Sequence, residues 1–234
     1  MESVKVEHHE TFDGIYWVTF SDGVKRLATI NLVEGKSVYG ERLIKAKGKE
    51  FRIWDPYRSK LAAAILKGLR KIPFSVGSKV LYLGSATGTT VSHVSDIVGE
   101  KGLVYCVDFA PRVMRKLIED LCPYRANLYP ILADARFPER YSNIVTTVDS
   151  VYCDIAQPEQ ARILADNAEL YLKKNGWIML AIKSRSIDVT LTPKEAFERE
   201  MEILKRRNFK LSDTIRLEPY EKDHAMVVAS YEKG

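Results

Sequence analysis

The stretch 79-KVLYLGSATGTTVSHVSDIVG-99 joins a short apolar run to an amphipathic segment through a cluster of small residues. Val80-Leu81-Tyr82-Leu83 is typical of a buried strand, and residues 89–98 have the spacing of a helix. Between them, the small residues from Gly84 to Thr90 leave the backbone open to close approach. The stretch therefore predicts a strand–turn–helix unit with a ligand lying over the turn.

Alternating strand and helix patterns continue through residues 56–234. We expect strands at 79–83, 103–108, 128–133, 150–154 and 177–182, and helices at 58–69, 89–98, 111–121, 158–173 and 193–207. Two further strands, near 210–219 and 224–231, follow without a helix between them, so the sheet is expected to finish with an antiparallel pair. The predicted fold class is α/β, with a doubly wound, mostly parallel sheet.

Residues 1–55 show a different pattern of short strands and turns. The segments 12–20 and 26–32 flank Ser21-Asp22-Gly23, which predicts a hairpin. A second strand pair is expected around Glu34-Gly35-Lys36, and Lys47-Gly48-Lys49 marks another turn. The chain is thus expected to divide into 1–55, a small N-terminal β-sheet domain, and 56–234, the α/β domain.

The net charge of +5 at pH 7 is unevenly distributed. Residues 1–55 hold 9 basic and 9 acidic residues, whereas the rest of the chain holds 27 basic and 22 acidic ones. The excess of positive charge therefore lies in the α/β domain, where it permits a polyanionic partner.

Compartment and metal content are also indicated by composition. No apolar run is long enough to span a bilayer, and the first residues lack a secretory signal, so we expect a cytoplasmic protein without membrane contact. Cys106, Cys122 and Cys153 lie far apart with no Cys-x-x-Cys pair. We therefore expect reduced thiols and no bound metal.

Polar residues follow the predicted strands at their carboxyl ends, where ligands bind in such sheets. Two cofactors compete for this layout. A dinucleotide needs Gly-x-Gly-x-x-Gly, and Thr90 stands where a further small residue is wanted. The small residues at 84, 86 and 88 favour S-adenosylmethionine, which has no phosphate. We predict that ten residues contact this donor. Gly84, Ala86, Thr89 and Thr90 belong to the turn, Asp108, Phe109, Asp134 and Ala135 would contact the ribose and the adenine, and the remaining two are Asp154 and Gln157.

Seven stretches together resemble fibrillarin, the 2′-O-methyltransferase of box C/D guide-RNA particles. They are WDPYRSKLAAAI, VLYLGSATGTTVSHVSDIVG, VYCVDFAPR, ILADAR, VYCDIAQPEQ, IKSRSIDVT and EPYEKDHAMVV, and they extend over essentially the whole chain. The sequence lacks a Gly/Arg-rich leader and most resembles the archaeal form. One departure is Asp108, where Glu is common in the family. The resemblance implies a Rossmann-like methyltransferase fold with a seven-stranded sheet.

The resemblance also implies a catalytic set, which matches Lys60, Asp154, Lys183 and His224. A lysine accepts a proton near neutral pH only where burial or a neighbouring cation lowers its pKa, so Lys60 could assist Lys183 as a base. Asp154 would orient Lys183 and hold the donor near the acceptor, and His224 would hydrogen-bond the acceptor ribose or a phosphate.

Structural interpretations of the same residues remain open. Asp154 or Gln157 could cap the helix near Pro158, and His224 could lie in a surface turn. We assign His8, His9 and His93 to similarly ordinary roles.

The implied partners are a box C/D guide RNA with its target RNA, a Nop-domain scaffold protein that docks this chain, and a kink-turn-binding protein that holds the guide. A charge of +5 is modest for binding RNA alone, so we expect base pairing to choose the target, with no role for DNA. Plausible phosphate contacts are Arg58, Arg112, Arg115 and Arg185.

Three other function classes remain as rivals. The first is another S-adenosylmethionine-dependent methyltransferase, acting on protein (glutamine, for example) or on a small molecule. The second is an NAD-dependent oxidoreductase, which the missing third glycine disfavours. The third is a non-catalytic subunit of an RNA particle.

Overall fold

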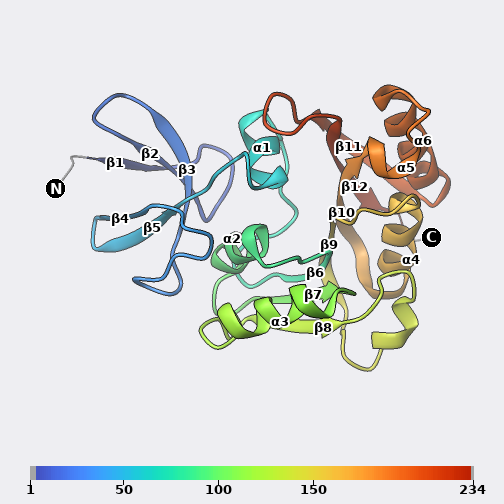
Figure 1. Ribbon diagram of the computed structural model, residues 1–234, viewed down its shortest axis with the longest axis horizontal. Helices are drawn as coiled ribbons and strands as arrows, with labels where there is room; N and C mark the ends of the chain where they lie inside the picture. Colours follow the sequence, from blue (N-terminus) through green and yellow to red (C-terminus); the bar gives the residue numbers. More distant parts are fainter. Residues whose placement is uncertain (1–3, 233–234) are drawn as a thin grey trace.

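The computed structural model describes residues 4–232, which form two sheets lying side by side (Figure 1). The first sheet has five antiparallel strands in the order β1-β2-β3-β5-β4. Its strands are β1 (Lys5–His8), β2 (Ile15–Thr19), β3 (Lys25–Ile30), β4 (Leu43–Ala46) and β5 (Lys49–Ile53). The expected N-terminal β domain is therefore present, and β2 and β3 form the hairpin predicted around Ser21-Asp22-Gly23.

The second predicted strand pair was misplaced. The strands β4 and β5 surround Lys47-Gly48, where both residues have positive φ (51° and 71°), as a tight hairpin turn requires. The segment around Glu34-Gly35-Lys36 is a loop instead. Its conformation is held by Asn31, whose side-chain Nδ2 donates to the carbonyl oxygens of Val33 and Lys36. Such side-chain bonds compete with strand pairing.

The second sheet has seven strands in the order β11-β12-β10-β9-β6-β7-β8. The strands from β10 to β8 are parallel, and β12 runs antiparallel to both β10 and β11. Its strands are β6 (Lys79–Leu83), β7 (Leu103–Asp108), β8 (Leu128–Leu132), β9 (Val148–Cys153), β10 (Leu172–Lys183), β11 (Phe209–Arg216) and β12 (His224–Tyr231). The antiparallel end predicted from the sequence is confirmed.

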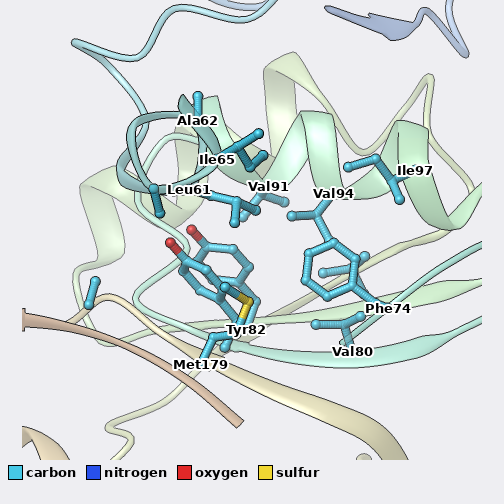
Figure 2. Packing of buried hydrophobic residues seen from close by; sticks show 14 of the residues in the cluster. Leu61, Ala62, Ile65, Phe74, Val80, Tyr82, Val91, Val94, Ile97 and Met179 are labelled. Carbon is cyan, nitrogen blue, oxygen red and sulfur yellow. The ribbon is translucent and has the colours of Figure 1, made fainter. Parts of the chain in front are cut away.

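Helices cover both faces of this sheet (Figure 1). They are α1 (Lys60–Leu66), α2 (Thr89–Val98), α3 (Pro111–Asp120), α4 (Gln160–Tyr171), α5 (Ser184–Ile187) and α6 (Pro193–Arg206), with a short 3-10 helix η1 (Pro138–Tyr141). The helices α1, α2 and α3 share one buried cluster, and α4 and α6 share another on the opposite face. Figure 2 shows Leu61 and Ile65 of α1 and Val94 of α2 packed above Val80 and Tyr82 of β6.

A buried polar cluster joins the two domains. The Asp96 carboxylate of α2 pairs with Arg52 of β5 at 2.7 Å and with Arg125 at 2.6 Å, and all three side chains are at most 2% exposed. His93, assigned to an ordinary role from sequence, lies fully buried beside them and bonds Thr29 and Tyr39. Burial, with the charges of both arginines, lowers the pKa of His93 well below its usual range, so this imidazole is neutral. The α/β domain therefore holds the N-terminal sheet in a fixed orientation.

The remaining expectations concern thiols, membranes and metals. The three cysteines are free, with Cys106 and Cys153 buried. Within residues 4–232, no helix is long and apolar enough to cross a bilayer. In the same part of the chain, no three His, Cys, Asp or Glu side chains gather where they could hold a metal ion.

Candidate active site

A cavity of about 240 Å³ lies at the carboxyl ends of five parallel strands, β6 to β10. Of the predicted donor contacts, Gly84, Ala86, Asp108, Phe109, Asp134, Ala135, Asp154 and Gln157 line it, and so does Lys183. Five separate strand ends converge because parallel strands finish at the same edge of a sheet. The cavity also has wall residues that the sequence did not single out, among them Ile155, Ala156, Arg136 and Ile163.

The glycines of the turn after β6 serve packing. Gly84 has φ +83°, and a Cβ atom there would lie 2.5 Å from the backbone oxygen of Asp154. Gly88 has φ +95°, and its Cβ would meet Leu121 and Leu117 at 2.5 and 2.8 Å. Of the residues in this turn, only Gly84 and Ala86 line the cavity. The spacing of the glycines therefore reflects the close approach of the turn to the end of β9 and to α3, as well as the room needed for a ligand.

Replacing Gly84 with alanine is expected to damage both stability and activity. The new Cβ would push on the backbone of Asp154, and the positive φ would add strain of about 1–3 kcal/mol. Gly23→Ala is the matched control, because Gly23 has the same φ of +83° with nothing within 4 Å of its Cβ position. Urea unfolding of both variants should show the larger loss for Gly84→Ala, and equal losses would contradict the packing argument.

Asp108 and Phe109 close β7 at the rim of the cavity. The Asp108 carboxylate accepts hydrogen bonds from the backbone N–H groups of Ala86 and Ala110, each at 3.0 Å. It thereby fixes the turn after β6 while remaining partly exposed in the cavity wall. Phe109 is 62% exposed, which is unusual for a phenyl ring and leaves one face open for an aromatic ligand.

Asp134 and Ala135 follow β8 on the same rim. Asp134 accepts hydrogen bonds from the backbone N–H and the guanidinium of Arg136. Those bonds, together with the charge of Arg136, hold the pKa of Asp134 below its usual range against the effect of burial. This carboxylate is therefore ionised near neutral pH and available as a hydrogen-bond acceptor in the wall.

Thr89 and Thr90, two of the predicted donor contacts, do not line the cavity. Thr90 is buried, and its hydroxyl donates to Ser59 Oγ at 3.0 Å. Ser59 in turn accepts from the backbone N–H of Ala62 as the N-cap of α1. Thr90 therefore connects the turn to the start of the helix that carries Lys60.

Lys60, Asp154 and Lys183 come together across 123 residues of sequence. Asp154 and Lys183 line the cavity, whereas Lys60 does not line it and reaches Asp154 from the start of α1. Asp154 Oδ1 lies 2.9 Å from Lys183 Nζ and 3.4 Å from Lys60 Nζ. Lys183 Nζ also donates to the backbone oxygen of Asp154 at 3.2 Å. The three side chains are each 15–18% exposed, so the group is largely desolvated but open to a ligand.

Two ammonium groups control the ionisation of Asp154. Burial alone would raise the pKa of this carboxyl, but the charges and hydrogen bonds of Lys60 and Lys183 outweigh it and hold the pKa below the usual value. Asp154 is therefore a carboxylate at neutral pH, and both lysines share it as their counter-ion.

This pKa shift predicts how stability depends on pH. Because the folded-state pKa of Asp154 is lowered, the carboxylate stabilises the protein above the unfolded-state pKa of about 3.9 and loses this effect as pH falls through the folded value. The difference in unfolding free energy between wild type and Asp154→Asn should thus be constant from pH 5 to 8 and shrink towards pH 3. Urea unfolding at each pH measures it, and a difference that grows in acid would contradict the ion-pair geometry.

His224 begins β12 directly opposite Lys183 in the antiparallel register, which places the two side chains on the same face of the sheet. Its Nδ1 lies 2.6 Å from the backbone oxygen of Lys222, and its side chain is 16% exposed. His224 is therefore next to the lysine and not in an isolated surface turn. Within residues 4–232, the hydrogen bond and the ion pair of His224 both involve Nδ1 and not the ring Nε2.

The helix-cap interpretation of Asp154 and Gln157 is wrong. The helix α4 starts at Gln160, its N-cap residue is Glu159, and no side chain caps it. Asp154 is held by the lysines, and Gln157 lines the cavity.

Gln160 is a positioning residue that the sequence analysis missed. It is fully buried, and its side-chain amide donates to the backbone oxygen of Lys183 at 3.1 Å and accepts from its backbone N–H at 2.9 Å. It thus supplies both hydrogen bonds that a neighbouring strand would give at this point. No local pattern distinguishes such a glutamine from an ordinary polar residue at a helix start.

Residues 6–233 match the family model described as Fibrillarin. The chain belongs to the fibrillarin family. It is 54% identical over 231 residues to the "Fibrillarin-like rRNA/tRNA 2'-O-methyltransferase" of Methanopyrus kandleri, with 99% of each chain covered. The resemblance proposed from the sequence is confirmed.

Two solved structures of fibrillarins bear on the cavity and its surroundings. Aeropyrum pernix fibrillarin, crystallised with natively bound S-adenosyl-L-methionine, is 50% identical with a TM-score of 0.91, covering 98% of this chain and all of that one. A fibrillarin/Nop5p complex contains a chain 42% identical with a TM-score of 0.80, covering 88% of this chain and 93% of that one. The expected fold class, a methyltransferase-type α/β sheet with an N-terminal antiparallel β domain, is therefore confirmed.

Proposed function

We propose that this chain transfers a methyl group from S-adenosylmethionine to the 2′-hydroxyl of a ribose in ribosomal or transfer RNA, as the catalytic subunit of a box C/D guide-RNA particle. The observation that carries the proposal is the carboxylate of Asp154 between two lysines, in the wall of a cavity built from five strand ends. The activity printed for the M. kandleri relative supports the same assignment.

The residues of the cavity fit an adenosylated sulfonium donor. Asp108 offers a carboxylate at the distance along the chain where a ribose is usually held, Phe109 offers an exposed ring for adenine, and Asp134 offers an acceptor for an amine. Gly84 and Ala86 line the cavity with no side chain larger than a methyl group. The bound donor supplies a positively charged, electrophilic methyl group, and Asp154 places a negative charge near it.

The lysines act on the acceptor. The ribose oxygen must approach the methyl carbon in line. As the new O–C bond forms, the bond from the methyl group to sulfur breaks, the thioether S-adenosylhomocysteine leaves, and the hydroxyl proton is released to solvent. We assign to Lys60 and Lys183 the orientation of that hydroxyl and the stabilisation of the charge that develops on its oxygen, because both ammonium groups lie within 3.4 Å of the same carboxylate oxygen of Asp154. Asp154 fixes their positions, and His224 binds the acceptor ribose or its phosphate.

The particle supplies the choice of target. We propose that a guide RNA pairs with the target RNA, that a Nop-domain scaffold docks this chain, and that a kink-turn-binding protein holds the guide. The fibrillarin/Nop5p complex supports the docking step. The proposed compartment is the cytoplasm.

The experiment is methyl transfer in a reconstituted particle with tritiated donor. The guided nucleotide should gain one methyl group, and the phosphodiester bond on its 3′ side should become resistant to alkaline hydrolysis. A matched target carrying a 2′-deoxyribose at that nucleotide should gain none. Transfer to the deoxy target, or to protein, would refute the proposal and favour another methyltransferase class.

The class of cofactor has its own test. Isothermal titration should show binding of S-adenosylmethionine to the isolated chain and no binding of NAD. Binding of NAD without binding of S-adenosylmethionine would instead favour the oxidoreductase interpretation.

A further inference from the structure

A groove with a volume of about 410 Å³ lies on the N-terminal sheet where it meets the segment before α1. It is formed by β3, by residues 39–42, by residues 53–58 and by Tyr220 from the connection between β11 and β12. It shares none of its lining with the donor cavity. The groove has a larger volume than the donor cavity, and no step of the proposed reaction uses it.

The side chains that the groove presents to solvent are mostly basic. Lys25, Arg26, Arg42 and Arg58 line it, and all four are exposed. The guanidinium groups are held over aromatic rings, since Arg42 lies 4.8 Å from the centre of Phe20 and Arg58 lies 5.1 Å from that of Tyr39. Preorganised guanidinium groups of this kind suit phosphate oxygens.

The acidic residues of the lining are engaged within the protein. Glu41 is 1% exposed, pairs with Arg52 at 2.7 Å and accepts from the backbone N–H groups of Val38 and Tyr39. Asp55 accepts from the backbone N–H of Tyr57. The exposed charged side chains of the lining are thus all basic, although residues 1–55 are neutral in sum.

An exposed aromatic ring stands at the edge of the groove. Tyr57 is 64% exposed, and it is steadied by an edge-on contact with Tyr220, with ring centres 5.2 Å apart. A fixed, solvent-facing ring beside cations is the usual arrangement for holding a nucleotide of a flexible RNA strand.

Both chain segments at this edge lead into the catalytic group. Arg58 precedes Lys60 by two residues, and Tyr220 precedes His224 by four. One edge of the groove therefore lies within two to four residues along the chain of side chains proposed to hold the acceptor ribose.

We propose that this groove binds the RNA strand next to the target nucleotide, with Arg58 on a phosphate and Tyr57 against the ring of a neighbouring nucleotide. This inference rests on the proposed function and names the surface by which the enzyme itself, apart from its particle partners, holds its substrate. The N-terminal domain, on this account, is part of the RNA site.

The test compares the double variant Tyr57→Ala/Arg58→Ala with wild type in the reconstituted particle. Stacking and phosphate contacts each change affinity by about tenfold, so KM for the target RNA should rise about tenfold or more while kcat and the dissociation constant of the donor stay within about twofold. The slope of log KM against log salt should fall by about one for the lost phosphate contact. Arg199→Ala is the control, because Arg199 is exposed on α6 on the opposite face of the sheet.

Each contrary outcome has a distinct meaning. An unchanged KM with an unchanged salt slope overturns the RNA assignment while the proposed function stands. Loss of co-elution with the Nop-domain scaffold, with the KM of the remaining assembled particle unchanged, overturns it in favour of a protein interface. If wild type itself fails to methylate guided RNA, the proposed function fails, and this inference falls with it.

Discussion

The variant Lys183→Ala should lose methyl transfer by about a hundredfold or more while it keeps its fold and its affinity for the donor. Lys183 Nζ lies in the cavity wall, 2.9 Å from Asp154 Oδ1, and its removal takes away one of the two cations proposed to orient the acceptor hydroxyl. Misplacement of a reacting group by about 1 Å is enough for such a loss. Single-turnover rates in the reconstituted particle, with saturating donor and RNA, measure the effect.

Lys173→Ala provides the control from the same strand. Lys173 also belongs to β10, pairs with an aspartate (Asp149, at 2.5 Å) and is half exposed, but it lies at the other end of the strand. The Lys173→Ala variant should transfer methyl groups at the wild-type rate. Asp154→Ala should fail as Lys183→Ala does, because it leaves Lys60 and Lys183 without their shared counter-ion. Near wild-type turnover in either site variant would rule out this catalytic assignment.

Asp96→Asn should lower the free energy of unfolding by about 3–5 kcal/mol, the loss typical of a broken buried ion pair. The carboxylate is completely buried and bonds Arg52, Arg125 and the hydroxyl of Thr29. Its neutralisation leaves the buried guanidinium of Arg125 without its carboxylate partner and that of Arg52 with Glu41 alone. Denaturant unfolding followed by circular dichroism measures the loss. Because Arg52 belongs to β5 and Asp96 to α2, limited proteolysis should also cut the N-terminal sheet first.

Asp120→Asn is the control for this prediction. Asp120 pairs with Lys116 at 2.5 Å on the surface of α3, with about half of each side chain exposed. Such surface pairs contribute about 1 kcal/mol or less. Equal losses in the two variants would show that the cluster around Asp96 does not hold the domains together.

The α/β sheet and the position of its ligand cavity are predictable from the sequence because both follow from local patterns. Apolar runs such as Val80–Leu83 define buried strands, and polar residues directly after them must gather at one edge of a parallel sheet. The position of Asp108, Asp134 and Asp154 at the carboxyl ends of predicted parallel strands therefore indicates that they share one cavity, and all three line it. The pairing of Lys60 with Asp154 came from the family resemblance, since no local pattern connects residues 94 positions apart.

The sequence is least informative where tertiary contacts decide a side chain's direction. Thr90 was predicted to contact the donor, and no sequence pattern indicates that its hydroxyl donates to Ser59. His93 lacked any sequence signal for burial, because the arginine pair beside it comes from β5 and from residue 125. The loop around Gly35 resembled a hairpin turn, but hydrogen bonds of the Asn31 and Glu50 side chains to its backbone hold it in a different conformation.

The most direct measurement is a crystal structure of the chain with S-adenosylmethionine and a guided RNA duplex. The account predicts adenosine between Asp108, Phe109 and Asp134, and a sulfonium methyl that faces Asp154. The target 2′-oxygen should lie about 3–3.5 Å from the methyl carbon, between Lys60 and Lys183. A donor bound outside this cavity, or lysines turned away from the acceptor ribose, would contradict it.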